Sequence, residues 1–430
     1  MYLAIDDTDS SNSMCTTYII ERIITESKYD IIGYPELVRL NPNISYKTRG
    51  NGALNINLGR GSGEKILIGF SSGRKIYGFE RMYMDADEDD VIEMASSIVG
   101  DLSELDDPKT NPGIVVSNER LDEHLYKKAL QEDININYIE NIIKNKRYKK
   151  FKNGHGIIGA AASLAWNKKR VTYELLNYRY PHYENIEKDK KMDIAMIPEK
   201  YQSTFNNIDY RNKYPAIFPK PKTPVIFGIR GISRDDIFKS YMEIRENYKI
   251  DDEAAIIYKT NQGTDDHILH EPELLNDLGS YRLTGTISSM PFSIEGGHHF
   301  IGFTYHGYSL YLAAFEPTKE FRHVIDSLIP GDIVSAYGSL DGNTLKLEKI
   351  DVIYTADLLK NEPPFCTKCN VKTRSKGKND YRCPVCGARY HTPRITKIKR
   401  GIEPGRYEVP VIARRHLSMP LKLASHFGLQ

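Results

Sequence analysis

The chain opens on a short apolar run, Tyr2 to Ile5, that ends in carboxylates. This pattern predicts a buried strand that delivers acidic side chains at its C-terminal end. After a polar loop, Thr16 or Thr17 can cap a helix whose isoleucines at 19, 20, 23 and 24 share one face. Further runs predict strands at 55–58, 65–70 and 114–116 and a helix at 87–99. The alternation predicts an α/β or α+β domain over residues 1–155.

Residues 156–275 continue the mixed pattern, with a predicted helix at 157–166 and strands at 225–229 and 254–258. Residues 276–357 change character, because short strand-like runs alternate there with turns that contain glycine. The runs lie at 281–287, 300–305, 310–315, 333–340 and 345–353, with one helical segment at 320–328. Five strands with one helical interruption fit an OB-fold, and they also fit another small barrel.

The composition indicates a globular chain of several domains. With 430 residues the chain is too long for one core, and 40% hydrophobic and 27% charged residues exclude the collagen-like and broadly disordered classes. No window approaches about 18 uninterrupted apolar residues, and the first residues lack the pattern of a secretory signal. We therefore expect a cytoplasmic protein without a membrane partner. Nothing in the sequence indicates an obligate protein partner.

The net charge of +2 conceals a strong asymmetry. Residues 366–430 hold 15 Lys and Arg against 3 Asp and Glu, whereas the rest of the chain holds 44 against 54. A basic module on a mildly acidic body is typical of a protein that binds nucleic acid at that end. A smaller basic run lies at 144–152, and residues 85–107 carry ten acids without a Lys or Arg. Each of these short runs is more simply explained as a solvated face.

Four of the five cysteines form two Cys-x-x-Cys pairs, Cys366 with Cys369 and Cys383 with Cys386. Each pair can place two thiolates on one tight turn, and together the pairs can form a tetrahedral zinc site. Four thiolates leave no open coordination position, so we expect the zinc to be structural. The Lys and Arg residues around the pairs make this ribbon a candidate binder of phosphate backbone. The fifth cysteine, Cys15, is expected to be a packed thiol.

Asp6, Asp7 and Asp9 follow one another closely at the end of the first predicted strand. Three negative charges this close repel one another unless they share a cation, and hard carboxylate oxygens favour Mg²⁺. The predicted helix start adds free backbone N–H groups that favour an anion. Hydroxyls surround the acids, at Thr8, Ser10, Ser11, Thr16 and Thr17. The combination indicates phosphoryl transfer, and the alternative is a polar turn that only caps the helix.

Two glycine-rich stretches look like nucleotide-binding motifs but do not meet their requirements. Gly154–Gly159 has the spacing G-x-G-x-x-G before a predicted helix, but residues 146–153 are too basic for the buried strand of a dinucleotide site. We expect a glycine turn into a helix there. Gly59–Lys65 lacks the Walker spacing, and G-K-[ST] does not occur in the chain.

Four stretches together resemble the archaeal tRNA 2-agmatinylcytidine synthetases. They are Ile5–Ser10 with Met14–Tyr18, Lys47–Ala53, Thr223–Gly231 and Tyr258–His267. The cysteine ribbon completes the order, and the resemblance extends over nearly the whole chain. His155 departs from the family pattern, which has a basic residue, often Arg, between the two glycines.

The resemblance implies a multidomain α+β fold of four modules. They are a kinase-like α/β domain at 1–155 that binds ATP and Mg²⁺, a ferredoxin-like domain at 156–275, an OB-fold β-barrel at 276–357, and a zinc ribbon with a basic tail at 358–430. The implied substrates are ATP, agmatine and the wobble cytidine of the isoleucine tRNA with anticodon CAU. Through a phosphorylated intermediate they give 2-agmatinylcytidine, AMP and phosphate. ATP, Mg²⁺ and structural Zn²⁺ are the implied cofactors.

The resemblance also implies the site residues. A threonine of the segment Met14–Tyr18 accepts phosphate, by position Thr16, with Thr17 as its neighbour. Asp6, Asp7 and Asp9 are assigned to Mg²⁺ and phosphate, and Thr8, Ser10, Lys47, Arg49, Gly50, Asn51 and Gly52 to ATP. Thr260, Asn261, Gln262, Gly263, Thr264, Asp265, Asp266 and His267 are assigned to agmatine, because a polar, acidic pocket suits its amine and guanidinium groups.

Two other functions stay open from the sequence. A barrel with a ribbon supports a non-catalytic tRNA or single-stranded nucleic-acid binding protein. Of the barrel aromatics Phe300, Phe303, Tyr305 and Tyr311, half are expected to point into the core and the others to contact RNA. A different ATP-dependent RNA-modifying or RNA-joining enzyme is the third. The long region before the barrel, with its acidic cluster, favours an enzyme, since a binding protein does not need it.

Overall fold

The computed structural model describes residues 1–10, 13–48, 50–180, 186–219 and 223–428. The chain divides into two units. Unit 1 contains Met1–Arg282, Tyr337–Gly342 and Glu408–Gln430, and unit 2 contains Leu283–Ala336 and Asn343–Tyr407. Within the described ranges, no helix is long and apolar enough to cross a lipid bilayer.

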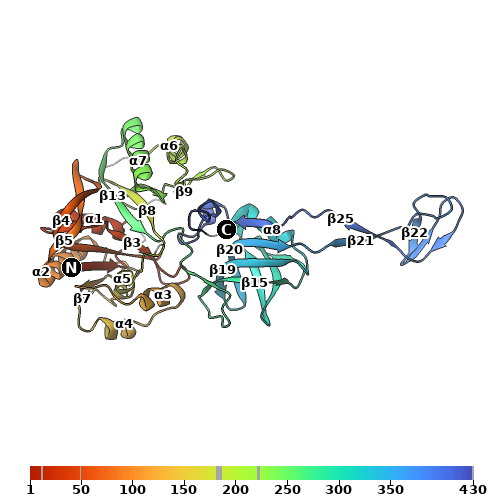
Figure 1. The fold of residues 1–430 in the computed structure, drawn as a ribbon, viewed down its shortest axis with the longest axis horizontal. Coiled ribbons are helices and arrows are strands. Elements are labelled where there is room, and N and C mark those ends of the chain that lie inside the picture. Colours follow the sequence, from red (N-terminus) through yellow and green to blue (C-terminus); the bar gives the residue numbers. More distant parts are fainter. Residues whose placement is uncertain (11–12, 49, 181–185, 220–222, 429–430) are drawn as a thin grey trace. The chain divides into compact units, whose positions relative to one another are not determined.

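Unit 1 is built on one continuous sheet (Figure 1). Its path among the described residues runs β7-β6-β1-β4-β3-β13-β8-β12-β9, and β2 and β5 pair beside β4. The strands are β1 (Tyr2–Asp6), β2 (Asp30–Ile32), β3 (Glu36–Arg39), β4 (Gly52–Ser71), β5 (Arg74–Asp85), β6 (Gly113–Ser117), β7 (Arg147–Lys150), β8 (Thr172–Arg179), β9 (Thr204–Phe205), β12 (Val225–Gly231) and β13 (Asp252–Thr260). Strand β3 pairs in parallel with β13, where Glu36 faces Lys259 and Leu37 faces Thr260. One sheet therefore contains strands from both sides of residue 155, where the sequence predicts the end of the first domain.

Helices cover both faces of this sheet, and the two-residue period of β1 separates the two cores. Leu3 and Ile5 pack in one core and Ala4 packs in the other. The first core includes residues of α1 (Thr16–Glu26), α2 (Glu88–Leu102), α6 (Lys190–Glu199) and α7 (Arg234–Tyr248), and the second those of α3 (Glu123–Gln131), α4 (Ile136–Ile143) and α5 (Gly156–Leu164). Figure 1 shows α3, α4 and α5 across the sheet from α6 and α7.

Several predicted elements of unit 1 are confirmed. The helix predicted at 87–99 is α2, and Asp87 caps it by accepting a hydrogen bond from the Asp90 N–H at 3.0 Å. The isoleucine face predicted for the first helix is buried in α1. The strands predicted at 55–58 and 65–70 are confirmed as strand, but they are joined in one long strand, β4, which pairs with β5. The sequence did not reveal β5, because most of its residues are exposed and no buried face marks it.

Five strands form a closed barrel, because the order β15-β19-β20-β18-β17 ends on a further pairing of β17 with β15. They are β15 (Ser280–Ile287), β17 (His298–Tyr305), β18 (Tyr308–Ala314), β19 (Ile333–Asp341) and β20 (Thr344–Tyr354), with β14 (Ile268–His270), β16 (Phe292–Ile294) and β26 (Gly405–Glu408) added at the sides. These are the five strands predicted from the sequence. The predicted helical interruption is present as η1 (Glu316–Phe321) and α8 (Arg322–Asp326).

The last part of the chain forms a ribbon and ends in unit 1. The ribbon contains β21 (Leu358–Glu362) paired with β25 (Arg394–Ile398), and a small sheet of β22 (Arg374–Gly377), β23 (Asp380–Arg382) and β24 (Arg389–Tyr390). The residues from Glu408 onward belong to unit 1, where Met419 and Leu423 pack with Phe205. The sequence analysis grouped this tail with the ribbon. Short elements complete unit 1: β10 (Ile208–Asp209), β11 (Tyr214–Pro215), η2 (Val411–Ala413) and η3 (Leu421–Leu423).

Glycines allow α5 to pack closely on the ends of β1 and β6. A Cβ on Gly156 would overlap the backbone of Gly113 and Asp6, and a Cβ on Gly159 would overlap the Asp6 carboxylate. Gly154, just before the helix, has a φ of +70°, which favours glycine. The preceding strand β7 is exposed and antiparallel to β6. The G-x-G-x-x-G stretch is therefore a glycine turn into a helix, as predicted, and not a dinucleotide motif.

Replacing Gly159 by alanine tests this close packing. The added Cβ has no room beside Asp6, so we expect Gly159→Ala to lower the free energy of unfolding by about 1–3 kcal/mol. Gly100→Ala is a matched control, because Gly100 also lies in a helix, α2, and its Cβ would meet Phe151 at an ordinary 3.6 Å. For Gly100→Ala we expect the free energy of unfolding to rise by up to about 1 kcal/mol, because alanine has the higher helix propensity. Urea unfolding measures the change in the free energy of unfolding for both variants. Equal changes in the two variants would contradict the packing argument.

Candidate functional site

The acidic cluster lies where β1 ends and the chain turns. Asp6 is the last residue of β1, and Asp7 has a left-handed backbone with a φ of +57°, which aspartate tolerates better than most residues. The Asp7 N–H donates to Asp6 Oδ1 at 2.7 Å, and the Asn111 N–H donates to the Asp7 carbonyl at 3.1 Å. This turn places both carboxylates in the lining of one pocket.

We name this pocket the acidic pocket. Its charged and polar lining consists of Asp6, Asp7, Asp9, Tyr46, Lys47, Thr48, Asn51, Glu132 and His155, its glycines are Gly50, Gly52 and Gly159, and its apolar wall is Leu40, Ile44, Ala129, Ile134 and Ile158. Four carboxylates outnumber the single lysine among these described residues. An acidic end beside an apolar wall suits a ligand that combines a flat apolar group with a group bound through a cation.

Burial and mutual repulsion change the acidity of the two carboxyls. Burial, with the Asp9 charge added, raises the pKa of Asp6 to about 7. Burial and then the charges of Asp6 and Asp9 raise the pKa of Asp7 to about 8, although hydrogen bonds from Asn111 oppose the rise. A cation between these groups would relieve the repulsion, so the pair favours cation binding.

The three aspartates do not form a closed metal cage. Among the described residues, the four ribbon cysteines form a group of at least three His, Cys, Asp or Glu side chains whose ligand atoms lie close together, and the aspartates do not form such a group. Mg²⁺ keeps several waters and takes one or two carboxylates together with substrate phosphates. Asp6 and Asp7 fit that requirement, whereas Asp9, the third predicted ligand, is engaged with Thr16.

Asp9 organises the start of α1. Its Oδ1 accepts hydrogen bonds from the Thr16 N–H at 2.6 Å and from the Thr16 hydroxyl at 3.0 Å. The Thr17 hydroxyl instead contacts the Cys15 Sγ at 3.0 Å. Both threonines are almost fully buried, but the carboxylate that can take a hydroxyl proton lies beside Thr16. The geometry thus distinguishes two threonines that are neighbours in the sequence.

A second pocket, which we name the basic pocket, adjoins the acidic pocket in unit 1. Both are lined by Asp9, Thr48, Gly50 and Gly52, and the basic pocket also contains Thr16 and Thr17. Its charged lining residues are Arg39, Arg230, Arg414 and Arg415, with Asp9 and Glu174 as carboxylates. Guanidinium groups bind phosphate through paired N–H donors. The charge of this pocket therefore suits phosphate groups rather than a cation.

The buried carboxylate of Glu174 connects the groups of the basic pocket. Glu174 in β8 faces Arg230 in β12 across the strand pair, and Arg230 Nε donates to Glu174 Oε1 at 2.8 Å. Gln262 Nε2 donates to the second carboxylate oxygen, and Arg39 Nη2 lies 3.8 Å from that oxygen. The sheet order β3-β13-β8-β12 brings these side chains together from distant parts of the sequence.

The segment predicted to bind agmatine, residues 260–267, is mostly structural. Asn261 exchanges hydrogen bonds with the Arg39 backbone at 2.7 and 2.8 Å. Both carboxylates already have partners, since Asp265 accepts from a backbone N–H at 2.6 Å and Asp266 from the Tyr126 hydroxyl at 2.8 Å. Among its described residues, Gln262 is the member that lines the basic pocket. The segment supports the wall of that pocket.

The residues predicted to bind ATP separate into two groups. Lys47, Gly50, Asn51 and Gly52 line the acidic pocket. Thr8 and Ser10 line neither pocket: Thr8 is fully buried, and the Ser10 hydroxyl donates to Glu104 and Asp107 at 2.5 and 3.0 Å. Arg49 lies outside the described residues.

The sequence analysis missed the arginines and the glutamate of the basic pocket. Arg39, Glu174 and Arg230 lie on three separate strands, β3, β8 and β12, so no local spacing marks them as one group. The run Arg414–His416 is visible in the sequence as a basic triplet, and its composition by itself is that of a tail that binds RNA backbone. Its return to unit 1 is a property of the fold and not of the local sequence.

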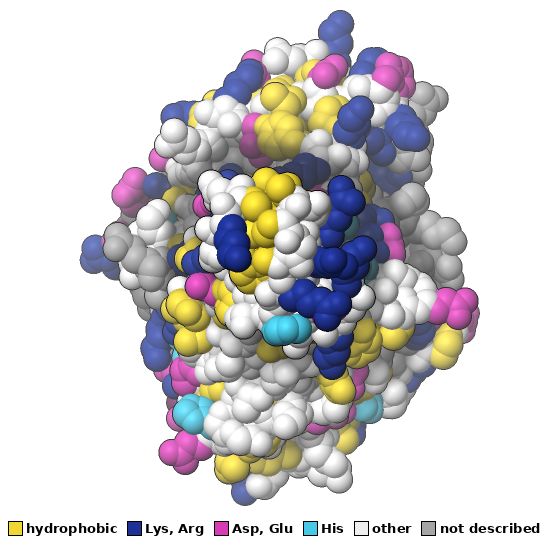
Figure 2. Space-filling model, turned by 90° about the vertical axis from the view of Figure 1, so that its right-hand side faces the viewer, with side chains coloured by type: hydrophobic (Ala, Val, Ile, Leu, Met, Phe, Trp, Pro, Cys, Tyr) yellow, Lys and Arg dark blue, Asp and Glu magenta, His cyan; other side chains and the backbone are white. Residues whose placement is uncertain are grey.

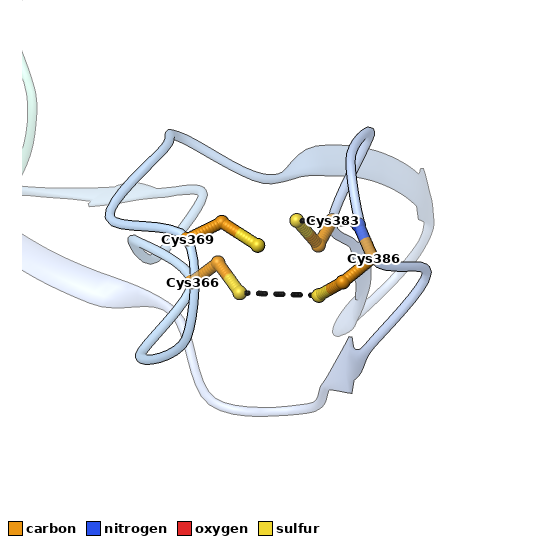
Figure 3. A group of neighbouring side chains, drawn as sticks. All are labelled: Cys366, Cys369, Cys383 and Cys386. Atoms are coloured by element: carbon orange, nitrogen blue, oxygen red, sulfur yellow. Dashed lines mark hydrogen bonds between the residues drawn. The ribbon is translucent and has the colours of Figure 1, made fainter.

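The four ribbon cysteines converge on one point (Figure 3). Their sulfur atoms all lie within 4.8 Å of one another, and the sulfurs of Cys366 and Cys386 are 3.6 Å apart. A Zn–S distance of about 2.3 Å places the sulfurs of a tetrahedral site about 3.8 Å apart. Both turns are alike, because Asn370 and Gly387 each donate a backbone N–H to the carbonyl of the first cysteine of the pair, at 2.8 and 3.1 Å. The residues fit a structural zinc ion.

Exposed cations surround the cysteine cluster. They are Lys368, Lys372, Arg374, Lys376, Lys378, Arg382, Arg389 and Arg394. Figure 2 shows Lys and Arg side chains gathered beside one another on the part nearest the viewer. A group of exposed cations suits the phosphate backbone of a nucleic acid.

Comparisons with known proteins agree with this arrangement. Three family models match the chain: the TiaS TCKD domain over residues 2–155, the TiaS FLD domain over 154–267, and the TiaS C-terminal zinc ribbon domain over 363–402. The isoleucine-tRNA 2-agmatinylcytidine synthetase TiaS of Thermoplasma volcanium is 49% identical over 99% of this chain and 98% of its own. The chain belongs to the TiaS family. The TiaS of Archaeoglobus fulgidus is 36% identical over 98% of this chain and 97% of its own.

Solved TiaS structures share the fold. A crystal structure of TiaS in complex with its isoleucine tRNA and ATP is 34% identical with a TM-score of 0.82, and covers 98% of this chain and 96% of that chain. A complex of TiaS with the same tRNA, AMPCPP and agmatine is 33% identical with a TM-score of 0.79 over the same shares. The family predicted from the sequence is confirmed.

The raised pKa values predict how the stability of this TiaS-family protein depends on pH. An acid with a pKa of about 8 when folded and about 4 when unfolded binds more protons in the folded state between those values. Without a divalent cation, the free energy of unfolding should therefore fall as the pH rises from about 4 to about 8. Asp7→Asn stays neutral and tolerates the same backbone, so its melting temperature should fall less. Thermal melts across this pH range measure the difference.

The comparison of the two proteins removes the titration of Asp7, whose charge repels that of Asp6. Burial raises the pKa of Glu21 to about 7, but Glu21 contributes the same pH dependence to wild type and variant. Mg²⁺ added at the alkaline end should raise the melting temperature of the wild type more than that of Asp7→Asn. Parallel curves for the two proteins, with and without Mg²⁺, would contradict the assignment.

Loss of one ribbon cysteine should affect zinc and tRNA binding together. Cys383→Ser removes one of four thiolates, and a small ribbon depends on its zinc ion for folding. We expect less than one zinc per chain, a weaker affinity for tRNA and a shallower dependence of that affinity on salt. Metal analysis and filter binding at several salt concentrations measure this. Cys15→Ser, outside the cluster, should keep its zinc, and full zinc content in both variants would exclude the site.

Proposed function

We propose that this chain is an ATP-dependent 2-agmatinylcytidine synthetase that acts on the isoleucine tRNA with anticodon CAU. The observation that carries the proposal is the match over the whole chain to a TiaS synthetase that is 49% identical. The solved TiaS complexes with ATP, and with AMPCPP and agmatine, support the same substrates here. The enzyme replaces the C2 oxygen of the wobble cytidine of the CAU anticodon by agmatine. A tRNA substrate also supports a cytoplasmic location.

The reaction needs ATP because the C2 carbonyl oxygen is a poor leaving group. A phosphoryl group on this oxygen lets it depart as phosphate. The primary amine of agmatine then attacks C2, which gives 2-agmatinylcytidine and releases the C2 oxygen as phosphate. Because AMP keeps only one of the three phosphorus atoms of ATP, a second phosphate is released by reaction with water. The protein must therefore hold a nucleotide, an extruded base and an amine next to one another.

The acidic pocket is the proposed site of ATP. Its apolar wall suits the adenine base, and the loop of Lys47, Gly50 and Gly52 suits close approach of the phosphates. Asp6 and Asp7 would hold Mg²⁺. When bound, Mg²⁺ supplies positive charge that neutralises the phosphates during transfer.

Thr16 is the proposed acceptor of a phosphoryl group. Its hydroxyl donates to Asp9 Oδ1 at 3.0 Å, so Asp9 can take the proton as the oxygen attacks phosphorus. Asp9 lines both pockets, whereas Thr16 lines the basic one. This placement supports transfer from a nucleotide on one side of Asp9 to a base on the other. The hydroxyl of Thr17 instead contacts the Cys15 Sγ.

The basic pocket is the proposed site of the cytidine. The base must leave its stack to reach an enclosed site. Arg39, Arg230, Arg414 and Arg415 would neutralise the phosphates that flank the extruded nucleotide. Gln262 replaces the longer segment 260–267 as the proposed contact with substrate, since it is the member of this segment that lines the basic pocket.

The barrel and ribbon are the proposed tRNA-binding modules. The closed five-strand barrel fits an OB-fold at 276–357, and the kinase-like and ferredoxin-like assignments of 1–155 and 156–275 remain part of this proposal. Phe303 and Tyr305 are buried in the barrel core, so they are the inward-pointing half of the four barrel aromatics. Tyr311 is 39% exposed and Phe300 stacks on Phe292, so these rings can accept bases. A purely RNA-binding protein is not favoured, because it has no use for the acidic pocket.

Product analysis tests the function. The protein is incubated with the isoleucine tRNA that has a CAU anticodon, ATP, Mg²⁺ and agmatine, and digested nucleosides are examined by mass spectrometry. We expect 2-agmatinylcytidine and AMP only when agmatine is present. Asp9→Asn keeps the size of the side chain but removes the base, so product formation should fall by roughly 10²-fold or more while tRNA binding persists.

The same tRNA with uridine at the wobble position is the substrate control, and it should give no product. A binding protein would form neither AMP nor modified nucleoside, and an RNA-joining enzyme would not require agmatine. Wild-type turnover by Asp9→Asn would remove the assignment of Asp9 to the transfer.

A further inference from the structure

The C-terminal tail lies against the predicted substrate segment and supplies one wall of the basic pocket. The Gly263 N–H donates to the His416 carbonyl at 2.8 Å, and the Asp265 N–H donates to the Leu417 carbonyl at 2.9 Å. These backbone hydrogen bonds place the His416 side chain in the lining of the pocket, beside Gln262. The tail is therefore part of the proposed active site.

The partners of Gln262 determine its orientation. Its Nε2 donates a hydrogen bond to Glu174 Oε2, because a carboxylate oxygen can only accept. Its Oε1 accepts from Arg230 Nε at 3.1 Å, because this nitrogen can only donate. The amide oxygen therefore also faces His416, at 2.8 Å from Nδ1. Because an amide oxygen only accepts, His416 Nδ1 carries the proton and donates it to Gln262.

This tautomer leaves the lone pair of a neutral His416 on Nε2. The ring edge that contains Nε2 lies against Gly50, where a Cβ would come within 2.8 Å of this atom. No side chain in the described part of the chain hydrogen-bonds to Nε2. The charge of Arg39, then burial and the charge of Arg230, hold the pKa of His416 well below its usual range. The ring is therefore unprotonated at neutral pH.

The two carboxylates that line the basic pocket already accept hydrogen bonds. Glu174 accepts from Arg230 and Gln262, and Asp9 accepts from Thr16. In the proposed reaction Asp9 takes the proton of Thr16, so the proton of the attacking amine needs a different acceptor. The chain Glu174–Gln262–His416 has the arrangement of an oriented base, in which a third group fixes the ring that receives the proton.

We propose that Nε2 of His416 accepts the proton of the agmatine amine as this amine attacks C2 of the phosphorylated cytidine, an inference that rests on the proposed function. The nitrogen lone pair forms the new C–N bond. The C2–O bond breaks, and its electron pair leaves with the phosphate. The proton on nitrogen passes to His416 and then to solvent. His416 thereby acts in the second step, whereas Asp9 acts in the first.

Two substitutions separate this role from a structural one. His416→Asn keeps a donor near the position of Nδ1 but has no atom at Nε2. His416→Gln places an amide near Nε2, which cannot accept a proton. In both variants we expect 2-agmatinylcytidine formation to fall by roughly 10²- to 10⁴-fold. The extent of Thr16 phosphorylation by ATP, measured by mass spectrometry, should stay at the wild-type value. The affinity for the substrate tRNA should also be unchanged.

Imidazole rescue provides the decisive readout. In His416→Ala, added imidazole should restore part of the agmatine step without changing Thr16 phosphorylation. His426→Asn, on the exposed surface of the same tail, is the matched control and should behave as wild type. An undiminished agmatine step in His416→Asn or His416→Gln would overturn the proposal, as would equal loss of both steps without rescue by imidazole. Absence of product from the wild type would instead contradict the proposed function itself.

Discussion

The short parallel pairing of β3 with β13 is the constraint on which the arrangement of the site depends. Glu36 and Leu37 face Lys259 and Thr260, and this pairing joins strands from the first third of the chain to strands that follow residue 155. It places β3 next to β13 in the order β3-β13-β8-β12, so the end of β3 belongs to the same sheet as β8 and β12. A shift of one residue in this register would turn the side chains at the end of β3 to the opposite face. The basic pocket would then lose Arg39.

The two adjoining pockets have opposite charge, and Asp9 lies in the lining of both. Buried acids with raised pKa values favour a cation in the acidic pocket, whereas clustered guanidinium groups favour phosphate in the basic pocket. This separation matches a reaction in which a metal-bound nucleotide must meet a polyanionic RNA. Repulsion between the two phosphate-rich substrates is reduced because each has its own countercharge.

The C-terminal tail returns to unit 1 and packs there. Backbone hydrogen bonds from Gly263 and Asp265 hold the tail against the substrate segment, and Met419 and Leu423 bury apolar surface with Phe205. The apolar burial offsets the loss of chain entropy. The tail follows the ribbon directly in the chain, so one continuous segment links the proposed tRNA-binding ribbon to the wall of the basic pocket.

The sequence alone determined the features whose signal is local. The Cys-x-x-Cys pairs, the acids that end β1, the isoleucine face of α1 and the five barrel strands each depend on residues close together in the chain, so spacing and periodicity were sufficient. Tertiary structure alone decided which threonine lies beside Asp9, that the acids of residues 260–267 serve structural hydrogen bonds, and that Arg39, Glu174, Arg230 and His416 share one pocket. These residues are isolated polar positions in distant segments. Only the pairing of strands and the docking of the tail bring them together, and neither leaves a periodic pattern in the sequence.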